Sequence, residues 1–161
     1  VGPLENNGCP WPDADNDGVP DKDDLCIDEA GAVVNNGCPE LSGEIMKTIN
    51  DRGAKINFAA NSDKILGKKM RNILLEIRDI LVENPKGNLL IEGYASADGS
   101  EDFNNELSVR RAETVRDLLV SLGISEARLQ VKGLGEKAPI ADNESPEGRA
   151  ENRRVQFIYK Y

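Results

Sequence analysis

The stretch at residues 89–122, LLIEGYASADGSEDFNNELSVRRAETVRDLLVSL, carries the pattern that is most informative about the fold. Its first three residues are apolar and predict a buried strand that ends at Gly93. From Leu107 to Leu122 apolar residues recur at helical spacing, which predicts an amphipathic helix closed by Gly123. Strands that alternate with helices in this way are typical of an α/β fold.

The sequence on both sides of this stretch continues the alternation. Residues 55–58 alternate with period two and predict a strand, while apolar residues from Leu66 to Leu81 predict a helix that ends before Pro85. Residues 129–131 and 155–159 predict two further strands. The order β-α-β-α-β-β predicts a two-layer α/β sandwich, in which two helices pack on one mixed sheet.

Charge and cysteines divide the chain near residue 40. Residues 1–40 hold ten acidic residues and one basic residue, so this quarter carries the whole net charge of −9 of the 161-residue chain. All three cysteines (Cys9, Cys26 and Cys38) lie there as well. We therefore predict an acidic, irregular segment over residues 1–40 and a mixed globular domain over residues 41–161.

The composition argues against several classes of function. The chain has no histidine, which excludes Ser-His-Asp and Cys-His catalytic sites and zinc bound by histidine. The negative net charge argues against a nucleic-acid partner, and no run of 18 apolar residues predicts a membrane-spanning helix. No acidic residue is isolated among apolar ones, as a carboxylate-pair hydrolase would need, so we predict no enzymatic activity. The first residue, Val1, and the lack of a signal peptide indicate a mature or excised fragment.

The acidic segment has the spacing of a calcium-binding loop. Two copies of Asn-Asn-Gly-Cys-Pro, Asn6–Pro10 and Asn35–Pro39, enclose residues 13–26, where carboxylates recur at every second position before a glycine. Hard oxygen ligands in this spacing favour Ca²⁺ over a transition metal. The alternative is a solvated acidic linker. The candidate ligands are Asp13, Asp15, Asp17, the carbonyl of Val19, Asp21 and Asp24.

Residues 13–26 resemble a thrombospondin type 3 repeat. The pattern D-x-D-x-D-G-x-x-D-x-x-D-x-C is matched at every fixed position. The resemblance implies bound Ca²⁺ and a disulfide between Cys26 and Cys38. Cys9 then has its partner upstream, or is free or intermolecular. A disulfide implies an oxidising compartment, which is the periplasm, the cell surface or the outside.

In the globular domain, Asn104 and Arg111 fall on the apolar stripe of the predicted helix, whereas Arg110 is rotated away from it. A buried arginine needs an acceptor. That acceptor is either an internal salt bridge or carbonyl cluster, or the carboxylate of a bound ligand. Near the C-terminus, Arg153 and Arg154 enter a predicted strand together, so their side chains point to opposite faces.

These residues belong to a set of motifs that resembles the OmpA-like peptidoglycan-binding domain. The resemblance covers about residues 45–161. The motifs are Ile56–Phe58, Ile91–Tyr94 with Gly99, Asn104–Val115 (N-x-x-L-S-x-x-R-A-x-x-V), Gly133–Pro139, Asp142–Asn143 and Gly148–Val155. A type 3 repeat ahead of such a domain also looks like outer-membrane porins of the Bacteroidetes type, which implies an upstream β-barrel.

The resemblance implies a non-enzymatic periplasmic domain that anchors an outer-membrane protein to the cell wall. It implies a pocket for the free carboxylate and amine of meso-diaminopimelate in the peptidoglycan stem. Arg111 matches the carboxylate-binding arginine, while Asn104, Arg153 and Asn61 match pocket positions. The family's G-H-T-D carries an aspartate for the amine, but here Ser96 takes its place, with Asp98 two residues on.

The Ser96 departure supports a second hypothesis. The chain would then be a Ca²⁺-stiffened stalk whose terminal domain mediates adhesion or forms homo-oligomers without binding the wall.

Overall fold

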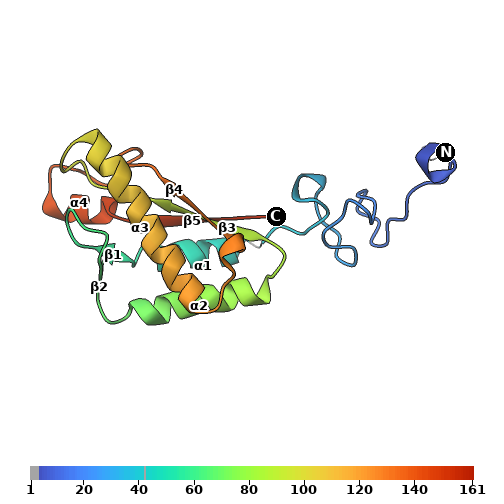
Figure 1. Ribbon diagram of the computed structural model, residues 1–161, viewed down its shortest axis with the longest axis horizontal. Helices are drawn as coiled ribbons and strands as arrows, with labels where there is room; N and C mark the ends of the chain where they lie inside the picture. Colours follow the sequence, from blue (N-terminus) through green and yellow to red (C-terminus); the bar gives the residue numbers. More distant parts are fainter. Residues whose placement is uncertain (1–3, 42) are drawn as a thin grey trace. The chain divides into compact units, whose positions relative to one another are not determined.

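The computed structural model describes residues 4–41 and 43–161 (Figure 1). One compact unit is Gly43–Lys160, and the residues before it form a second. No helix in the described ranges has both the length and the apolar character that a membrane crossing requires. The elements of the larger unit are α1 (Gly43–Gly53), β1 (Asn57–Phe58), β2 (Ile65–Leu66), α2 (Met70–Glu83), β3 (Asn88–Gly93), α3 (Glu101–Ser121), β4 (Leu129–Gly133), α4 (Pro146–Asn152) and β5 (Val155–Lys160).

The main sheet has the order β4-β3-β5, with β3 parallel to β4 and antiparallel to β5. The long helix α3 makes the crossover between the two parallel strands, as a parallel pair requires (Figure 1). Buried residues of α2 and α3 join Leu89, Ile91 and Phe157 of the sheet in one hydrophobic core. The predicted α/β sandwich is therefore confirmed.

The structure differs from the sequence prediction around the first strand. Residues 65–66 form β2, which pairs with β1 as a short hairpin, so α2 begins at Met70 and not at Leu66. Since β1 pairs with β2, the main sheet has three strands and the hairpin stands apart from it. The helices α1 and α4 are additional. The spacing of apolar residues shows which segments are strands, but it does not show their pairing partners.

Two glycines let α3 approach the sheet closely. Gly93 of β3 and Gly133 of β4 lie opposite each other, directly beneath Ser108 of α3. A Cβ atom at Gly93 would come within 1.9 Å of the Ser108 carbonyl oxygen, and one at Gly133 within 2.5 Å of its Oγ. This contact fixes the N-terminal half of α3, which carries Asn104 and Arg111, over the carboxyl end of β3.

The smaller unit has few buried apolar residues, which are Val19, Cys26 and Cys38. A disulfide joins the two cysteines, the pairing that the resemblance implies, and Cys9 is exposed and free. The repeated sequence gives a repeated backbone. Each copy, Asn6–Pro10 and Asn35–Pro39, has its second Asn at φ 50° or 52° and its glycine at φ 77° or 76°. The disulfide closes a loop of irregular chain that has too little apolar surface to form a core.

We expect Gly93→Ala to lower the free energy of unfolding by about 1–3 kcal/mol or more, because the added methyl group meets backbone that cannot move aside. Urea unfolding followed by circular dichroism measures the change. Gly43→Ala is the matched control, since a Cβ atom there meets nothing within 4 Å. Equal stability of the two variants would contradict the close approach of α3.

Candidate functional site

Loops from distant parts of the chain form a pocket at the end of the sheet where β3 and β4 finish. The pocket has a volume of about 330 Å³ and is lined by Ala60, Asn61, Asp98, Pro146, Arg149 and Arg153. Three of the six residues that the sequence indicated for peptidoglycan, Asn61, Asp98 and Arg153, line this pocket together. The other three, Ser96, Asn104 and Arg111, are buried around it.

Arg111 is completely buried, and its guanidinium rests on three backbone carbonyls. Nε donates to Ser62 O at 3.0 Å, Nη1 to Tyr94 O at 3.1 Å and Nη2 to Ala59 O at 3.1 Å. Of the two environments that the sequence left open, the structure therefore contains a carbonyl cluster. This cluster ties the loop after β1, which forms one wall of the pocket, to the chain that leaves β3. A direct contact between Arg111 and a ligand carboxylate stays a prediction.

Burial, together with the positive charges of Arg153 and Arg110, lowers the pKa of Arg111 to about 10, while the negative charge of Asp63 opposes the shift. The guanidinium is still protonated at neutral pH. Its three hydrogen bonds go to neutral oxygens, its guanidinium carbon lies 5.1 Å from the centre of the Phe58 ring, and no carboxylate of the described residues pairs with it within 4 Å. Arg111 thus places a buried positive charge close to Arg153, a residue that faces the pocket.

The adjacent arginines Arg153 and Arg154 diverge, as their positions at the start of β5 predict. Arg153 lines the pocket, where its Nε donates to Phe58 O at 3.4 Å. Arg154 is buried, with its guanidinium carbon 3.8 Å from the centre of the Tyr94 ring. Burial and the hydrogen bond to Glu92 raise the pKa of Tyr94 to about 12, so the phenol stays neutral. Tyr94 therefore connects two arginines, Arg154 through its ring and Arg111 through its carbonyl.

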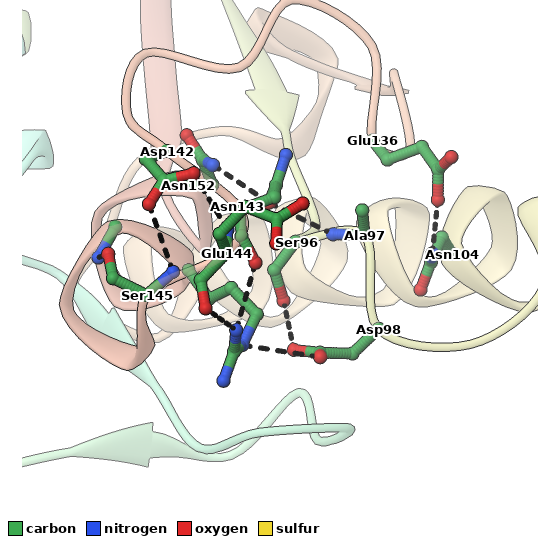
Figure 2. A network of polar contacts seen from close by, with 12 residues as sticks. Ser96, Ala97, Asp98, Asn104, Glu136, Asp142, Asn143, Glu144, Ser145 and Asn152 are labelled. Atoms are coloured by element: carbon green, nitrogen blue, oxygen red, sulfur yellow. Dashed lines mark hydrogen bonds and ion pairs between the residues drawn. The ribbon is translucent and has the colours of Figure 1, made fainter.

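Asp98 is held in the pocket by two donors (Figure 2). The buried Ser96 Oγ donates to Asp98 Oδ2 at 2.9 Å, and Arg149 Nε lies 3.3 Å from Asp98 Oδ1. The Arg149 guanidinium is itself fixed, because Nη1 donates to the carbonyls of Asn143 and Glu144, each at 2.9 Å. The hydroxyl of Ser96 thus supports the carboxylate of Asp98. Asp98 lines the pocket, whereas Ser96 does not.

Two residues of α4 that the sequence reasoning did not select belong to the polar network at the pocket, Arg149 in its lining and Asn152 behind it. The buried Asn152 amide accepts from the N–H groups of Ile140 and Ala141 and donates to Asn143 Oδ1 at 2.9 Å. Asn143 Oδ1 also accepts from Ala97 N–H at 3.2 Å, so the chain of contacts reaches the Asp98 loop (Figure 2). The signal in the sequence was the cluster of polar residues at 148–154, whose partners lie in loops that only the fold brings near.

Asn104 lies in the first turns of α3 and is 1% exposed. Its Nδ2 donates to Glu136 Oε2 at 2.6 Å, while its Oδ1 is buried without a donor among the described residues. Asn104 does not line the pocket. It connects α3 to the loop after β4 and faces Gly99 of the Asp98 loop.

In the smaller unit, the carboxylates of Asp13, Asp15 and Asp17 each bring one oxygen within 4.8 Å of the others. Asp13 Oδ1, Asp15 Oδ2 and Asp24 Oδ2 are buried without a hydrogen-bond donor among the described residues. Asp17 accepts from the N–H groups of Val19 and Gly31, and Asp21 accepts from Ala14 N–H. Of the predicted ligands, Asp13, Asp15 and Asp17 therefore cluster, the negative charge of Asp24 acts on Asp15, and Asp21 accepts a hydrogen bond that closes the loop.

The pKa of Asp15 is raised, first by desolvation and then by the negative charges of Asp17, Asp24 and Asp13. Carboxylates that repel one another and have buried oxygens without donors fit a hard cation. The set contains no nitrogen and no thiolate, which suits Ca²⁺ better than zinc or copper.

Comparisons with known proteins agree on one family. The model of the OmpA family matches residues 57–153. Outer membrane porin F of Pseudomonas aeruginosa is 36% identical over 147 residues, which cover 89% of this chain and 40% of the porin. The peptidoglycan-binding protein ArfA of Mycobacterium bovis is 43% identical over 86 residues, 53% of this chain and 26% of that protein. The chain thus spans less than half of either relative. The match to the porin extends into the acidic segment, because it is longer than Gly43–Lys160.

Solved structures show the same fold. The peptidoglycan-associated lipoprotein of Burkholderia pseudomallei has a TM-score of 0.61 at 28% identity, over 65% of this chain and 88% of that one. The C-terminal domain of Helicobacter pylori MotB has a TM-score of 0.60 at 27% identity, over 66% of this chain and 83% of that one. Because the family model covers more than half of the sequence and the fold agrees, the chain belongs to the OmpA family.

Proposed function

We propose that this chain binds peptidoglycan non-covalently and anchors an outer-membrane protein to the cell wall from the periplasm. The observation that carries the proposal is the pair of arginines at the pocket. Arg111 and Arg153 are adjacent, and neither has a carboxylate within 4 Å in the part of the chain that the structure describes. Two neighbouring guanidinium groups without an anion suit a ligand carboxylate.

The relatives support this proposal by their names. One is described as peptidoglycan-binding, one as peptidoglycan-associated and one as an outer membrane porin. The ligand group we propose is the free carboxylate of meso-diaminopimelate in the stem peptide. Arg153, which lines the pocket, would contact this carboxylate, and Asn61, which also lines the pocket, would lie beside it. The buried positive charge of Arg111 would attract the carboxylate without contacting it. This is a binding function, and no catalytic step is part of it.

We also propose that the acidic segment is a thrombospondin type 3 repeat that binds Ca²⁺. The support is the carboxylate cluster of Asp13, Asp15 and Asp17, together with the buried oxygens of Asp13, Asp15 and Asp24 that lack a donor among the described residues. Asp13, Asp15, Asp17 and Asp24 would hold the ion through their oxygens. Bound Ca²⁺ would neutralise their mutual repulsion and, with the Cys26–Cys38 disulfide, stiffen a segment without a core.

We expect Arg153→Ala to weaken binding to peptidoglycan about tenfold or more, because it removes a charged donor from the pocket. Co-sedimentation of the full chain with purified peptidoglycan measures this. Arg153 is preferred to Arg111 for the test, since the Arg111 side chain also holds two loops together. Arg71→Ala is the control, because Arg71 is exposed on α2 and lies outside the pocket.

Two outcomes would contradict the peptidoglycan proposal. Equal sedimentation of Arg153→Ala and the parent would show that the pocket does not bind the wall. A parent chain that stays in solution would favour the alternative, a stalk whose terminal domain mediates adhesion or oligomerisation.

For the acidic segment, Asp15→Asn is expected to lower Ca²⁺ affinity about tenfold or more, since the number of charged ligands sets the affinity of such loops. Isothermal titration calorimetry on the full chain with the disulfide intact gives the constant. Asp28→Asn removes an exposed carboxylate of the same segment outside the proposed set and should change little. If the parent takes up no Ca²⁺ at millimolar concentration, the segment is an acidic linker.

A further inference from the structure

The pocket has more positive than negative charge. Of its six lining residues, Arg149 and Arg153 are basic and Asp98 is the only acid. The carboxylate of Asp98 is already paired with Arg149 at 3.3 Å. The buried charge of Arg111 adds to that of Arg153. The negative charge of Asp63 acts on Arg111, but this carboxylate lies 3.9 Å from a different arginine, Arg110.

The two groups that could bind an ammonium are both committed to other partners. Ser96, at the position where the resemblance places an aspartate, is neutral and buried, and its hydroxyl donates to Asp98 Oδ2. Asp98 has one donor on each oxygen, and its partner Arg149 is held by the carbonyls of Asn143 and Glu144. An ammonium that enters the pocket would meet the guanidinium groups of Arg149 and Arg153, with the charge of Arg111 buried behind them, and one carboxylate that is already paired.

We infer that this pocket recognises the ligand carboxylate without requiring a free amine beside it. The inference rests on the proposed function and narrows its ligand class. The amine of the diaminopimelate side chain is acylated when two stems are cross-linked, and its positive charge is then lost. This chain therefore accepts a cross-linked stem, a carboxylate next to a neutral amide, at least as well as a stem with a free amine.

The charges on the two forms of the ligand give the reason. A stem with a free amine presents one carboxylate and one ammonium, so it leaves the excess positive charge of the pocket unchanged. Acylation leaves a single negative charge, which compensates the pair Arg111 and Arg153 in part. In a partly desolvated pocket, removal of a like-charge contact favours binding.

Three soluble tetrapeptide stems test the inference by calorimetry with the full chain. One has the free side-chain amine, one has that amine acetylated, and one has the adjacent carboxylate converted to the amide. We expect acetylation to leave the Kd within about threefold or to tighten binding, and amidation of the carboxylate to weaken it about tenfold or more. Weakening of more than about threefold on acetylation would overturn the inference.

The variant Asp98→Asn separates a role in amine binding from a role in structure, because it keeps the shape and removes the charge. We expect the Kd values of the free-amine and acetylated stems to shift in the same direction and by factors that agree within about threefold, since Asp98 is committed to Arg149 and not to the amine. A loss of about tenfold for that stem alone, with the acetylated stem unaffected, would show that Asp98 binds the amine. Unchanged urea unfolding of the variant checks that the loop is intact.

Failure of the inference differs from failure of the proposed function. If the free-amine stem binds and the acetylated stem does not, the chain binds peptidoglycan but requires the free amine for binding. If none of the three stems binds and the chain also stays in solution with purified peptidoglycan, both are overturned. Arg153→Ala should weaken binding of the free-amine and acetylated stems alike, because both use the carboxylate.

Discussion

The buried guanidinium of Arg111 is the interaction on which the arrangement of the site depends. One side chain from the middle of α3 donates to three carbonyls, two in the loop after β1 and one directly after β3. Each of these carbonyl oxygens accepts a hydrogen bond, but no carboxylate of the described residues pairs with the positive charge of the guanidinium. A buried cation with neutral partners costs desolvation energy unless an anion lies nearby. The same residue therefore holds the pocket loops together and adds a buried positive charge beside them.

The close contact of α3 with the sheet makes this arrangement possible. Gly93 and Gly133 leave space for Ser108, and the helix then lies low enough for Arg111 to reach backbone on both sides of it. The side chain of Asn152 accepts from a backbone N–H group in the loop after β4 and donates to Asn143. Arg149, on the same helix as Asn152, pairs with Asp98. Binding geometry and fold stability thus depend on the same few polar contacts.

The acidic segment differs from the globular domain in the interactions that constrain its backbone. Its carboxylates repel one another, and its buried apolar residues are few. A disulfide between residues 12 apart constrains this segment, which has few buried apolar residues. The globular domain depends on apolar burial, whereas the acidic segment depends on a covalent cross-link and, in our proposal, on Ca²⁺.

Much of this could be read from the sequence, because periodicity and spacing are local properties. The helical spacing of apolar residues indicated α2 and α3, and the position of Arg111 on the apolar stripe indicated its burial. The spacing of aspartates indicated the cluster in the acidic segment. In contrast, the start of α2 at Met70 depended on the pairing of β2 with β1, which brings together residues of similar local pattern.

What the tertiary structure alone decided is which groups meet. Ser96, Asp98 and Arg149 are ordinary polar residues in the sequence, and their spacing does not show that Asp98 is paired. The partners of Arg111 are backbone carbonyls, which every residue carries and no side-chain pattern can single out. From the sequence alone we could predict the two long helices, the strands of the main sheet, the buried stripe of α3 and the charge of each segment, but not α1, β2 or α4. The charge balance of the pocket arose from long-range contacts, because electrostatic compensation depends on distances between loops that are far apart in the chain.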